Sequence, residues 1–350
     1  MQSQDQKRNR RIRRIVCRCF AALATVAIMA GCAPTNRNQP MHRFNDPMRT
    51  YGVGRFVVDI PAAMSFAGGY HLRNRKIEEV VWRDTDTEKA AEQAWKKRLT
   101  EIEAMPPPQG VEKALIEIID FPDIQKWCRA VFYYGDPLDT ELPGIPLKGY
   151  LDILCHTGRT DLWITSYGKS SAKDFMYSKS TDIARAYRAP EKRFDRAEVI
   201  DGRDAFYLRY GAVDLPFEYK ESVDIVFRKH PLDKQLVLSV ESDVVDKVYP
   251  IGLMDRLTTM ISTNLVPGLK IEKIRTRNRI VAGLKGEEVI YRGIENDGTR
   301  GLCFSWDYPG QENAPHAPNM VIDMLAQDDH LEEKLALWDA ILESLRPAGR

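Results

Sequence analysis

The chain has 350 residues, of which 43% are hydrophobic and 29% charged, so it is not a chain that is disordered throughout. A mean hydropathy of -0.40 excludes a membrane protein with many spans, and the length predicts about two domains. The formal net charge of +1 conceals a strongly basic start, because residues 7–18 hold many of the positive charges.

The basic start is typical of a secretory signal. An apolar run follows over residues 20–30 and is too short for a comfortable transmembrane helix. It ends in Met29-Ala30-Gly31-Cys32, which resembles a bacterial lipobox, so we predict that Cys32 carries lipid and becomes the mature N-terminus. The alternative is a plain secretory signal in which Cys32 is incidental. Ala33 favours the outer membrane by resemblance to other lipoproteins, so we expect a periplasmic protein anchored there by lipid.

Removal of residues 1–31 changes the charge balance. The mature chain keeps 44 Lys and Arg against 49 Asp and Glu, a net charge of about -5. An acidic body argues against a nucleic-acid partner, because phosphates need clustered cations. The expected partners are therefore proteins or small molecules, and the predicted lipid is the expected attachment to a membrane.

Secondary-structure elements of the first half follow a tether at residues 32–50. Strands are predicted at residues 55–61 and 77–82. A helix follows, beginning at a capping box of Thr85 and Glu88 and ending before Pro106. Four more strands are predicted at residues 114–119, 126–133, 150–155 and 161–166, and a helix at residues 172–187 ends this half.

The second half repeats this order in outline. Alternating apolar residues predict strands near residues 223–227 and 236–240, before a helix that contains Leu253, Leu257 and Ile261. Strands are then predicted at residues 274–281, 287–292, 301–308 and 320–325. A helix with an apolar stripe from Leu331 to Leu345 closes the chain.

These patterns predict an α+β protein of two domains, each an antiparallel sheet with helices packed on one face. The predicted divisions are a signal peptide at 1–31, a tether at 32–50, an N-terminal domain at 51–190 and a C-terminal domain at 191–350. A boundary near residue 265 is the competing interpretation.

Three cysteines, Cys128, Cys155 and Cys303, remain after Cys17 and Cys19 leave with the signal and Cys32 takes lipid. Three cannot all pair in an oxidising compartment. Cys128 and Cys155 lie on neighbouring predicted strands, where a disulfide would contribute roughly 3 kcal/mol. The alternative is three buried thiols.

Motifs that would indicate an enzyme are missing. There is no G-x-S-x-G elbow and no H-E-x-x-H, and no phosphate or dinucleotide loop is complete. Six histidines are scattered without metal-ligand spacing, so no metal and no cofactor are predicted. Cys155 and His156 are adjacent on a predicted strand and should point to opposite faces, which disfavours thiol catalysis.

One hairpin is unusual in composition. Arg279-Ile280-Val281-Ala282-Gly283-Leu284-Lys285-Gly286-Glu287-Glu288 reads as strand, turn, strand. If the chain were an enzyme with an unfamiliar site, Glu287 and Glu288 would be the first carboxylates to test. A structural hairpin in which one glutamate pairs with a nearby arginine is the favoured interpretation.

This hairpin, with three later segments, resembles the C-terminal domain of type VI secretion lipase-effector immunity proteins of the fourth lipase-effector family. The later segments are Phe304-Ser305-Trp306-Asp307-Tyr308-Pro309-Gly310, Pro318-Asn319-Met320-Val321-Ile322 and Leu337-Trp338-Asp339-Ala340-Ile341-Leu342-Glu343-Ser344-Leu345-Arg346-Pro347. Gly54-Arg55-Phe56-Val57-Val58-Asp59-Ile60-Pro61 is similar to the opening of the N-terminal domain of that family.

The resemblance implies a periplasmic α+β protein that binds a cognate phospholipase toxin and blocks its action on membrane lipid. It brings no catalytic residues and does not identify the partner-binding residues. An envelope scaffold without a toxin partner is the alternative function, and an enzyme is a further one.

Overall fold

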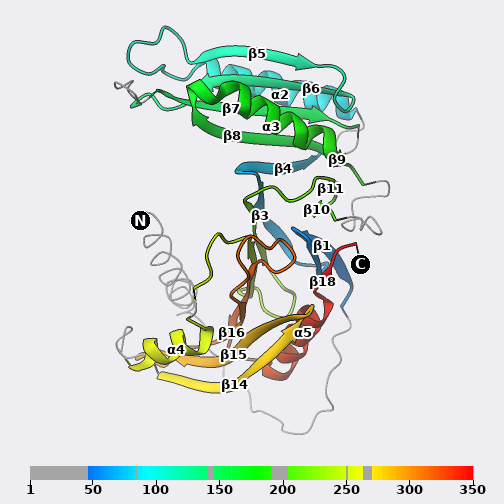
Figure 1. Ribbon diagram of the computed structural model, residues 1–350. Helices are drawn as coiled ribbons and strands as arrows, with labels where there is room; N and C mark the ends of the chain where they lie inside the picture. The colour runs from blue at the N-terminus through cyan, green and yellow to red at the C-terminus, as the bar shows by residue number, and fades with distance from the viewer. Residues whose placement is uncertain are drawn as a thin grey trace.

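The computed structural model describes residues 46–82, 86–139, 146–158, 160–190, 204–249, 251–262 and 270–349. Cys32, the signal peptide and most of the predicted tether lie outside these residues. Within them the chain is mixed α+β, which confirms the predicted class (Figure 1). The described part has four α-helices, which are α2 (Thr87–Glu103), α3 (Lys173–Ala186), α4 (Leu253–Ser262) and α5 (Leu331–Ser344).

A 12-stranded antiparallel sheet dominates the described residues, in the order β14-β15-β16-β17-β13-β12-β3-β4-β8-β7-β6-β5. Its strands are β3 (Ser65–Leu72), β4 (Arg75–Val81), β5 (Leu115–Phe121), β6 (Trp127–Tyr134), β7 (Lys148–His156), β8 (Thr160–Lys169), β12 (Glu221–Arg228), β13 (Val237–Asp243), β14 (Lys270–Val281), β15 (Leu284–Ile294), β16 (Arg300–Tyr308) and β17 (Asn319–Gln327). The prediction of a separate sheet for each half of the chain was wrong, because the strands form one continuous sheet.

Two small sheets lie beside the large one. The first joins β1 (Met48–Val53) and β2 (Phe56–Pro61) to β18 (Arg346–Pro347), and so brings both ends of the described chain together. The second joins β9 (Tyr187–Arg188), β10 (Phe206–Tyr207) and β11 (Ala212–Val213). Ser344 strengthens the first contact, because its Oγ accepts a hydrogen bond of 2.9 Å from the backbone N–H of Asp59.

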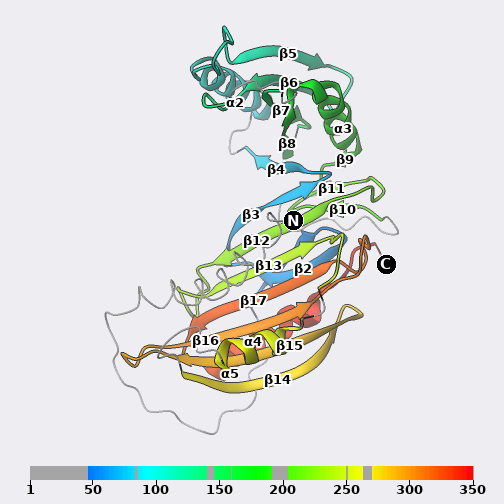
Figure 2. The same cartoon turned by 60° about the vertical axis from the view of Figure 1, so that its left-hand side comes forward.

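The large sheet is narrowest between β3 and β4. β3 pairs with β12 over eight residues, whereas it pairs with β4 over only Tyr70–Ile77, His71–Lys76 and Leu72–Arg75. We call β4 to β8 with α2 and α3 the N-half, and β3 and β12 to β17 with α4 and α5 the C-half. β3 comes early in the chain and yet belongs to the C-half by its pairing with β12 (Figure 2).

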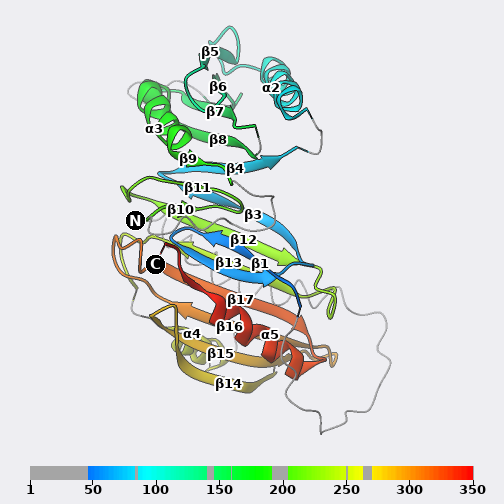
Figure 3. The same cartoon turned by 90° about the vertical axis from the view of Figure 1, so that its right-hand side faces the viewer.

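The helices of each half cover both faces of the sheet, so the prediction of helices on one face was wrong. In the N-half, Trp95 of α2 packs with Val131 and Leu154, while Met176 of α3 packs on the face that holds Ile153. Figure 3 shows the two helices on either side of these strands. The cause is that β6 and β7 bury successive residues, so that both of their faces need a covering helix.

The predicted elements otherwise match the observed ones, with ends that differ by a few residues. The side chain of Asp86 caps α2, with its Oδ1 accepting from the backbone N–H of Lys89 at 3.0 Å. The predicted cap residue Thr85 lies outside the described residues.

Candidate partner-binding face

The two glutamates singled out by the sequence lie side by side on β15 and point to opposite faces of the sheet. Glu287 accepts a hydrogen bond of 2.8 Å from the backbone N–H of Met254, in the first turn of α4. Glu288 accepts one of 2.7 Å from Trp338 Nε1 on α5. Successive residues of a strand face opposite ways, so the pair cannot act together on one substrate.

Glu288 is the buried centre of a partly exposed ion cluster. Its side chain is fully buried, and Arg275, Arg277 and Arg279 of the edge strand β14 all donate to it. Asp339 of α5 shares two of these arginines, with Arg275 Nη2 at 2.7 Å and Arg279 Nη1 at 2.5 Å. The favoured interpretation of this hairpin, a glutamate paired with a nearby arginine, is therefore confirmed.

The electrostatics of the cluster fit a structural role. Burial raises the pKa of Glu288, but the hydrogen bonds from Trp338 and Arg277 and the charges of Arg275 and Arg279 outweigh it and hold the pKa below its usual value. A carboxylate that stays ionised and bonded on every side attaches α5 to β14 and β15 and is no proton carrier.

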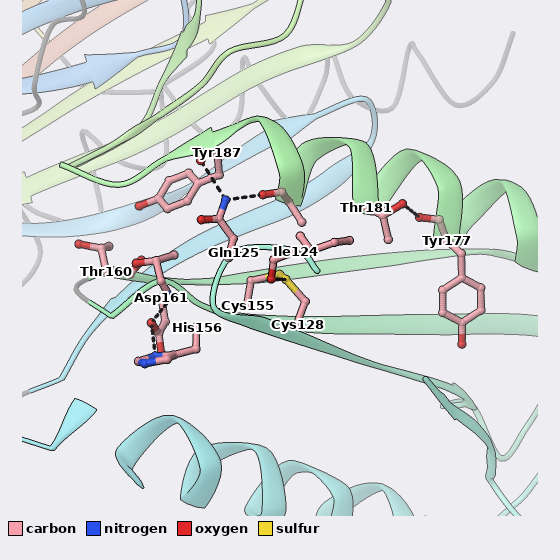
Figure 4. The surroundings of a disulfide bond; sticks show 12 residues. Ile124, Gln125, Cys128, Cys155, His156, Thr160, Asp161, Tyr177, Thr181 and Tyr187 are labelled. Carbon is pink, nitrogen blue, oxygen red and sulfur yellow. Dashed lines mark hydrogen bonds and ion pairs between the residues drawn. A yellow bond between two sulfur atoms is a disulfide. The ribbon is translucent and has the colours of Figure 1, made fainter. Parts of the chain in front are cut away.

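Cys128 and Cys155 form a disulfide that joins β6 to β7 (Figure 4). The sequence analysis left two alternatives, this disulfide or three buried thiols. Cys303 is a buried thiol in the structure. The sulfurs lie on the α3 side of the sheet. Gln125 fixes the end of α3 beside them, since its Nε2 donates to the backbone oxygens of Ala184 and Tyr187 at 2.7 and 3.0 Å.

His156 lies on the opposite face from Cys155, as predicted. Its Nδ1 is 2.9 Å from Oδ1 of Asp161, and both side chains are fully buried. Asp161 also accepts from Trp82 Nε1 at 2.6 Å and from the backbone N–H of Thr157 at 3.0 Å. The pair resembles a catalytic dyad in composition only. The pair is closed to solvent, and among the described residues no nucleophile lies within hydrogen-bonding distance of His156 Nε2.

The described residues contain no group of three or more His, Cys, Asp or Glu side chains placed to hold a metal ion. None of their helices is both long and apolar enough to cross a bilayer.

An open area of sheet lies between α2 and α4. The strand register places Glu287, beside α4, on the same face as Trp163, beside α2. Between the helices this face presents exposed or half-exposed side chains from β3, β4 and β12, which are those of Ala67, His71, Lys76, Glu78, Asp224 and Val226. The other face of the same strands is buried, with Tyr70, Leu72, Ile77, Val223, Ile225 and Phe227 in the core. We call the exposed side the open face (Figure 2).

The open face is flat and mixed in charge. Ala67, Gly68 and Gly69 leave the middle of β3 without large side chains. Lys76 and Glu78 form an ion pair on β4. Partial burial and the charge of Lys76 lower the pKa of His71, while Asp224 opposes the shift, so this imidazole is neutral at pH 7.

Sequence reasoning missed this face because it missed β3. The signal was present, since Phe66, Tyr70 and Leu72 alternate with Ala67, Gly69 and His71. Two glycines in the middle of the segment concealed the alternation.

Residues 208–348 match the family model described as Tle cognate immunity protein 4 C-terminal domain. No curated protein matches the chain.

Solved structures with a similar fold include a chain in the crystal structure of a Tle4–Tli4 complex, with 19% identity, a TM-score of 0.67, and coverage of 86% of this chain and 98% of that chain. The apo immunity protein TplEi of the type VI secretion system from Pseudomonas aeruginosa matches with 20% identity and a TM-score of 0.67, over 86% of this chain and 97% of that chain. TplEi bound to an "L" peptide matches with 20% identity and a TM-score of 0.62, over 87% and 99%.

These matches agree with the resemblance inferred from the sequence, which is confirmed. The match to the Tle cognate immunity protein 4 C-terminal domain covers residues 208–348, the part of the chain that holds the hairpin and the three later segments.

Proposed function

We propose that the chain is an immunity protein that binds and inhibits a cognate phospholipase toxin delivered by the type VI secretion system. The observation that carries the proposal is the match of residues 208–348 to an immunity-protein domain. It is supported by the likeness, over 86% of the chain, to a protein crystallised in a Tle4–Tli4 complex.

The open face is the binding surface we propose. A stable complex with an enzyme buries more than about 1,000 Å² in total, which requires a broad surface and not a pocket. The open face offers small side chains on β3 and exposed or half-exposed polar and apolar side chains on β4 and β12, with a helix at each end. A lipase held there would have its active site covered or its lid fixed, and either would stop hydrolysis without chemistry by the inhibitor.

The inhibitor would act at the membrane that the toxin attacks. We propose that Cys32 is lipidated and anchors the protein to the outer membrane, facing the periplasm. The lipobox-like segment and the short apolar run support this placement. Anchoring raises the concentration of the inhibitor near the lipid substrate.

We also propose that the two predicted domains meet at the narrow contact between β3 and β4. The three residue pairs there support a boundary in the sheet at this point. The pairing of β3 with β12 supports assigning the early strands β1 to β3 to the same domain as the C-terminal strands.

The test is capture of the toxin by the mature chain. Tagged protein would be used to isolate partners from the envelope of the source organism, and phospholipase activity would be measured in the captured material with and without excess bait. A lipase that is silenced by the bait is the expected result. Capture of resident envelope proteins alone would favour a scaffold instead.

A matched pair of variants locates the binding surface. Ala67→Arg adds a large charged side chain at an exposed position of the open face, and Thr276→Arg adds the same side chain at an exposed position of β14. We expect Ala67→Arg to weaken lipase capture at least tenfold and Thr276→Arg to leave it unchanged. Equal capture by both variants would place the interface elsewhere.

A further inference from the structure

The two edge strands of the 12-stranded sheet, β5 and β14, differ in how they are protected. An edge strand presents unpaired backbone groups, and natural proteins guard such edges with charges, bulges or covering elements because a free edge pairs with other chains. Both edges carry one register irregularity, between Leu115 and Glu117 in β5 and between Lys273 and Arg275 in β14. The bulge therefore does not distinguish them.

Charge distinguishes the edges. β14 has the sequence KIEKIRTRNRIV, with five Lys and Arg residues and one Glu in 12 residues. β5 has the sequence LIEIIDF, with no Lys or Arg. The two acids of β5 are already engaged within the chain, Glu117 with Lys173 at 2.8 Å and Asp120 with Arg129 at 3.4 Å. The arginines of β14 are engaged too, with Glu288 and Asp339, so the edges differ in the number of their charges, which is two in β5 and six in β14.

The β5 edge also exposes large apolar side chains. Ile116 is 39% exposed and Ile118 is 45% exposed. Ile118 faces the α2 side of the sheet, because its register partner is Val131, which packs with α2. From Glu117 to Phe121 the strand keeps regular register with β6, so five residues in succession are shaped for pairing.

The sequence of β5 is complementary to itself in the antiparallel direction. If two copies meet with Ile118 opposite Ile118 of the second copy, Glu117 lies opposite Ile119 within the part of β5 that keeps regular register. Asp120 then lies beside the irregular position at Ile116, so no like charges face each other and the exposed Ile118 is covered. A shift that places Glu117 opposite Glu117 of the second copy is disfavoured by repulsion.

We propose that the β5 edge is a homodimer contact, in which β5 of two copies pair antiparallel about Ile118 and continue the sheet from one molecule into the next. The proposal does not rest on the proposed function, since the open face is separated from β5 by the strands under α2. The contact involves few residues, so the dimer is weak and forms with rising concentration. Lipid anchoring would favour it by raising local concentration.

The test combines crosslinking with mass measurement on the mature chain. Ile118→Cys places a thiol at the symmetry axis, and mild oxidation is expected to convert this variant to a covalent dimer. Ile280→Cys on β14 is the matched control and is expected to stay monomeric over the same time. Ile280 is 66% exposed, so the control thiol is at least as accessible. Both variants change exposed side chains and should fold.

Sedimentation from micromolar to submillimolar concentration gives the second readout. The unmodified chain should pass from monomer towards dimer, Ile118→Lys should remain monomeric, and Ile280→Lys should behave as the unmodified chain. A monomer at every concentration together with no Ile118→Cys crosslink would overturn the proposal. Protection of the Ile118→Cys thiol only after a captured lipase is added would also overturn the proposal, because β5 would then be a contact with the lipase.

Discussion

The N-half and the C-half contain different cross-links, a disulfide between two strands in the one and a cluster of ion pairs between a helix and an edge strand in the other. In the N-half, α2 and α3 enclose β6 and β7, and the bond between Cys128 and Cys155 joins these two strands. In the C-half, α5 is attached by the ion cluster in which Glu288 and Asp339 bind three arginines of β14. The N-half therefore contains a bond that reductant can break, and the C-half contains a cluster whose carboxylates can be protonated by acid.

The largest effect is expected from breaking the ion cluster. Glu288→Ala should lower the free energy of unfolding by roughly 3–5 kcal/mol, because it leaves a cavity at the Trp338 N–H and leaves three arginines with Asp339 as their shared carboxylate. Unfolding in urea, monitored by tryptophan fluorescence, measures this loss in the free energy of unfolding. The neighbouring Glu287→Ala serves as the control and should cost only about 1 kcal/mol, the loss of one bond at the start of α4.

The same cluster has a predictable pH dependence. The pKa of Glu288 in the folded chain is below its usual value, so the stability it contributes is present at neutral pH and is lost as pH falls through the folded pKa. The difference between the unmodified chain and Glu288→Ala should shrink on acidification. Equal costs for the Glu287 and Glu288 variants would contradict the account of the C-half.

Removal of the disulfide should have the next largest effect. The bond closes a loop with a sequence separation of 27, so Cys128→Ala with Cys155→Ala should lower the free energy of unfolding by about 3 kcal/mol. Reductant should weaken the unmodified chain by a similar amount and leave the double variant unchanged. A double variant that still responds to reductant would show that the effect does not come from this bond.

A smaller, pH-dependent gain is expected at Asp323. Burial, with the nearby Glu241 and Asp307, raises the pKa of Asp323 to about 7 in spite of the hydrogen bond from Ser305. The folded state then binds more protons than the unfolded state between the ordinary pKa and this value, so stability falls as pH rises through this range.

Asp323→Asn removes the titration and keeps the shape. The variant should melt a few degrees above the unmodified chain at pH 8 and close to it at pH 4. Differential scanning fluorimetry over this range is the measurement. A constant difference across all pH values would mean that Asp323 does not titrate between them.

The smallest effect concerns the contact between the halves. Because β3 and β4 share only three residue pairs, backbone amides bonded across them should exchange hydrogen faster than those between β3 and β12. Hydrogen exchange read by NMR separates the two groups. Equal protection would show that the halves open together.

The sequence was sufficient to predict most individual elements, because their apolar periodicity is strong. The stripe that contains Leu335, Trp338 and Leu342 predicted α5, and the alternation of Val223, Ile225 and Phe227 predicted β12. How the elements join was harder. The missed strand β3 connects the halves, and its glycines concealed it, so the single sheet could not be foreseen.

The chemistry of the candidate site was partly predictable. The opposite orientation of Cys155 and His156 follows from strand geometry alone. The three arginine partners of Glu288 required the register of β14 against β15, which no local pattern gives. The open face required knowledge of which strands lack a covering helix, a property of tertiary structure.

The most direct test of the central claim is a titration of the captured phospholipase with the mature chain, with hydrolysis of phospholipid vesicles as the readout. If the chain is an immunity protein, activity should fall in proportion to the added chain and reach background near one equivalent. Ala67→Arg should require a large excess. Hydrolysis that continues unchanged in the presence of excess chain would contradict the account.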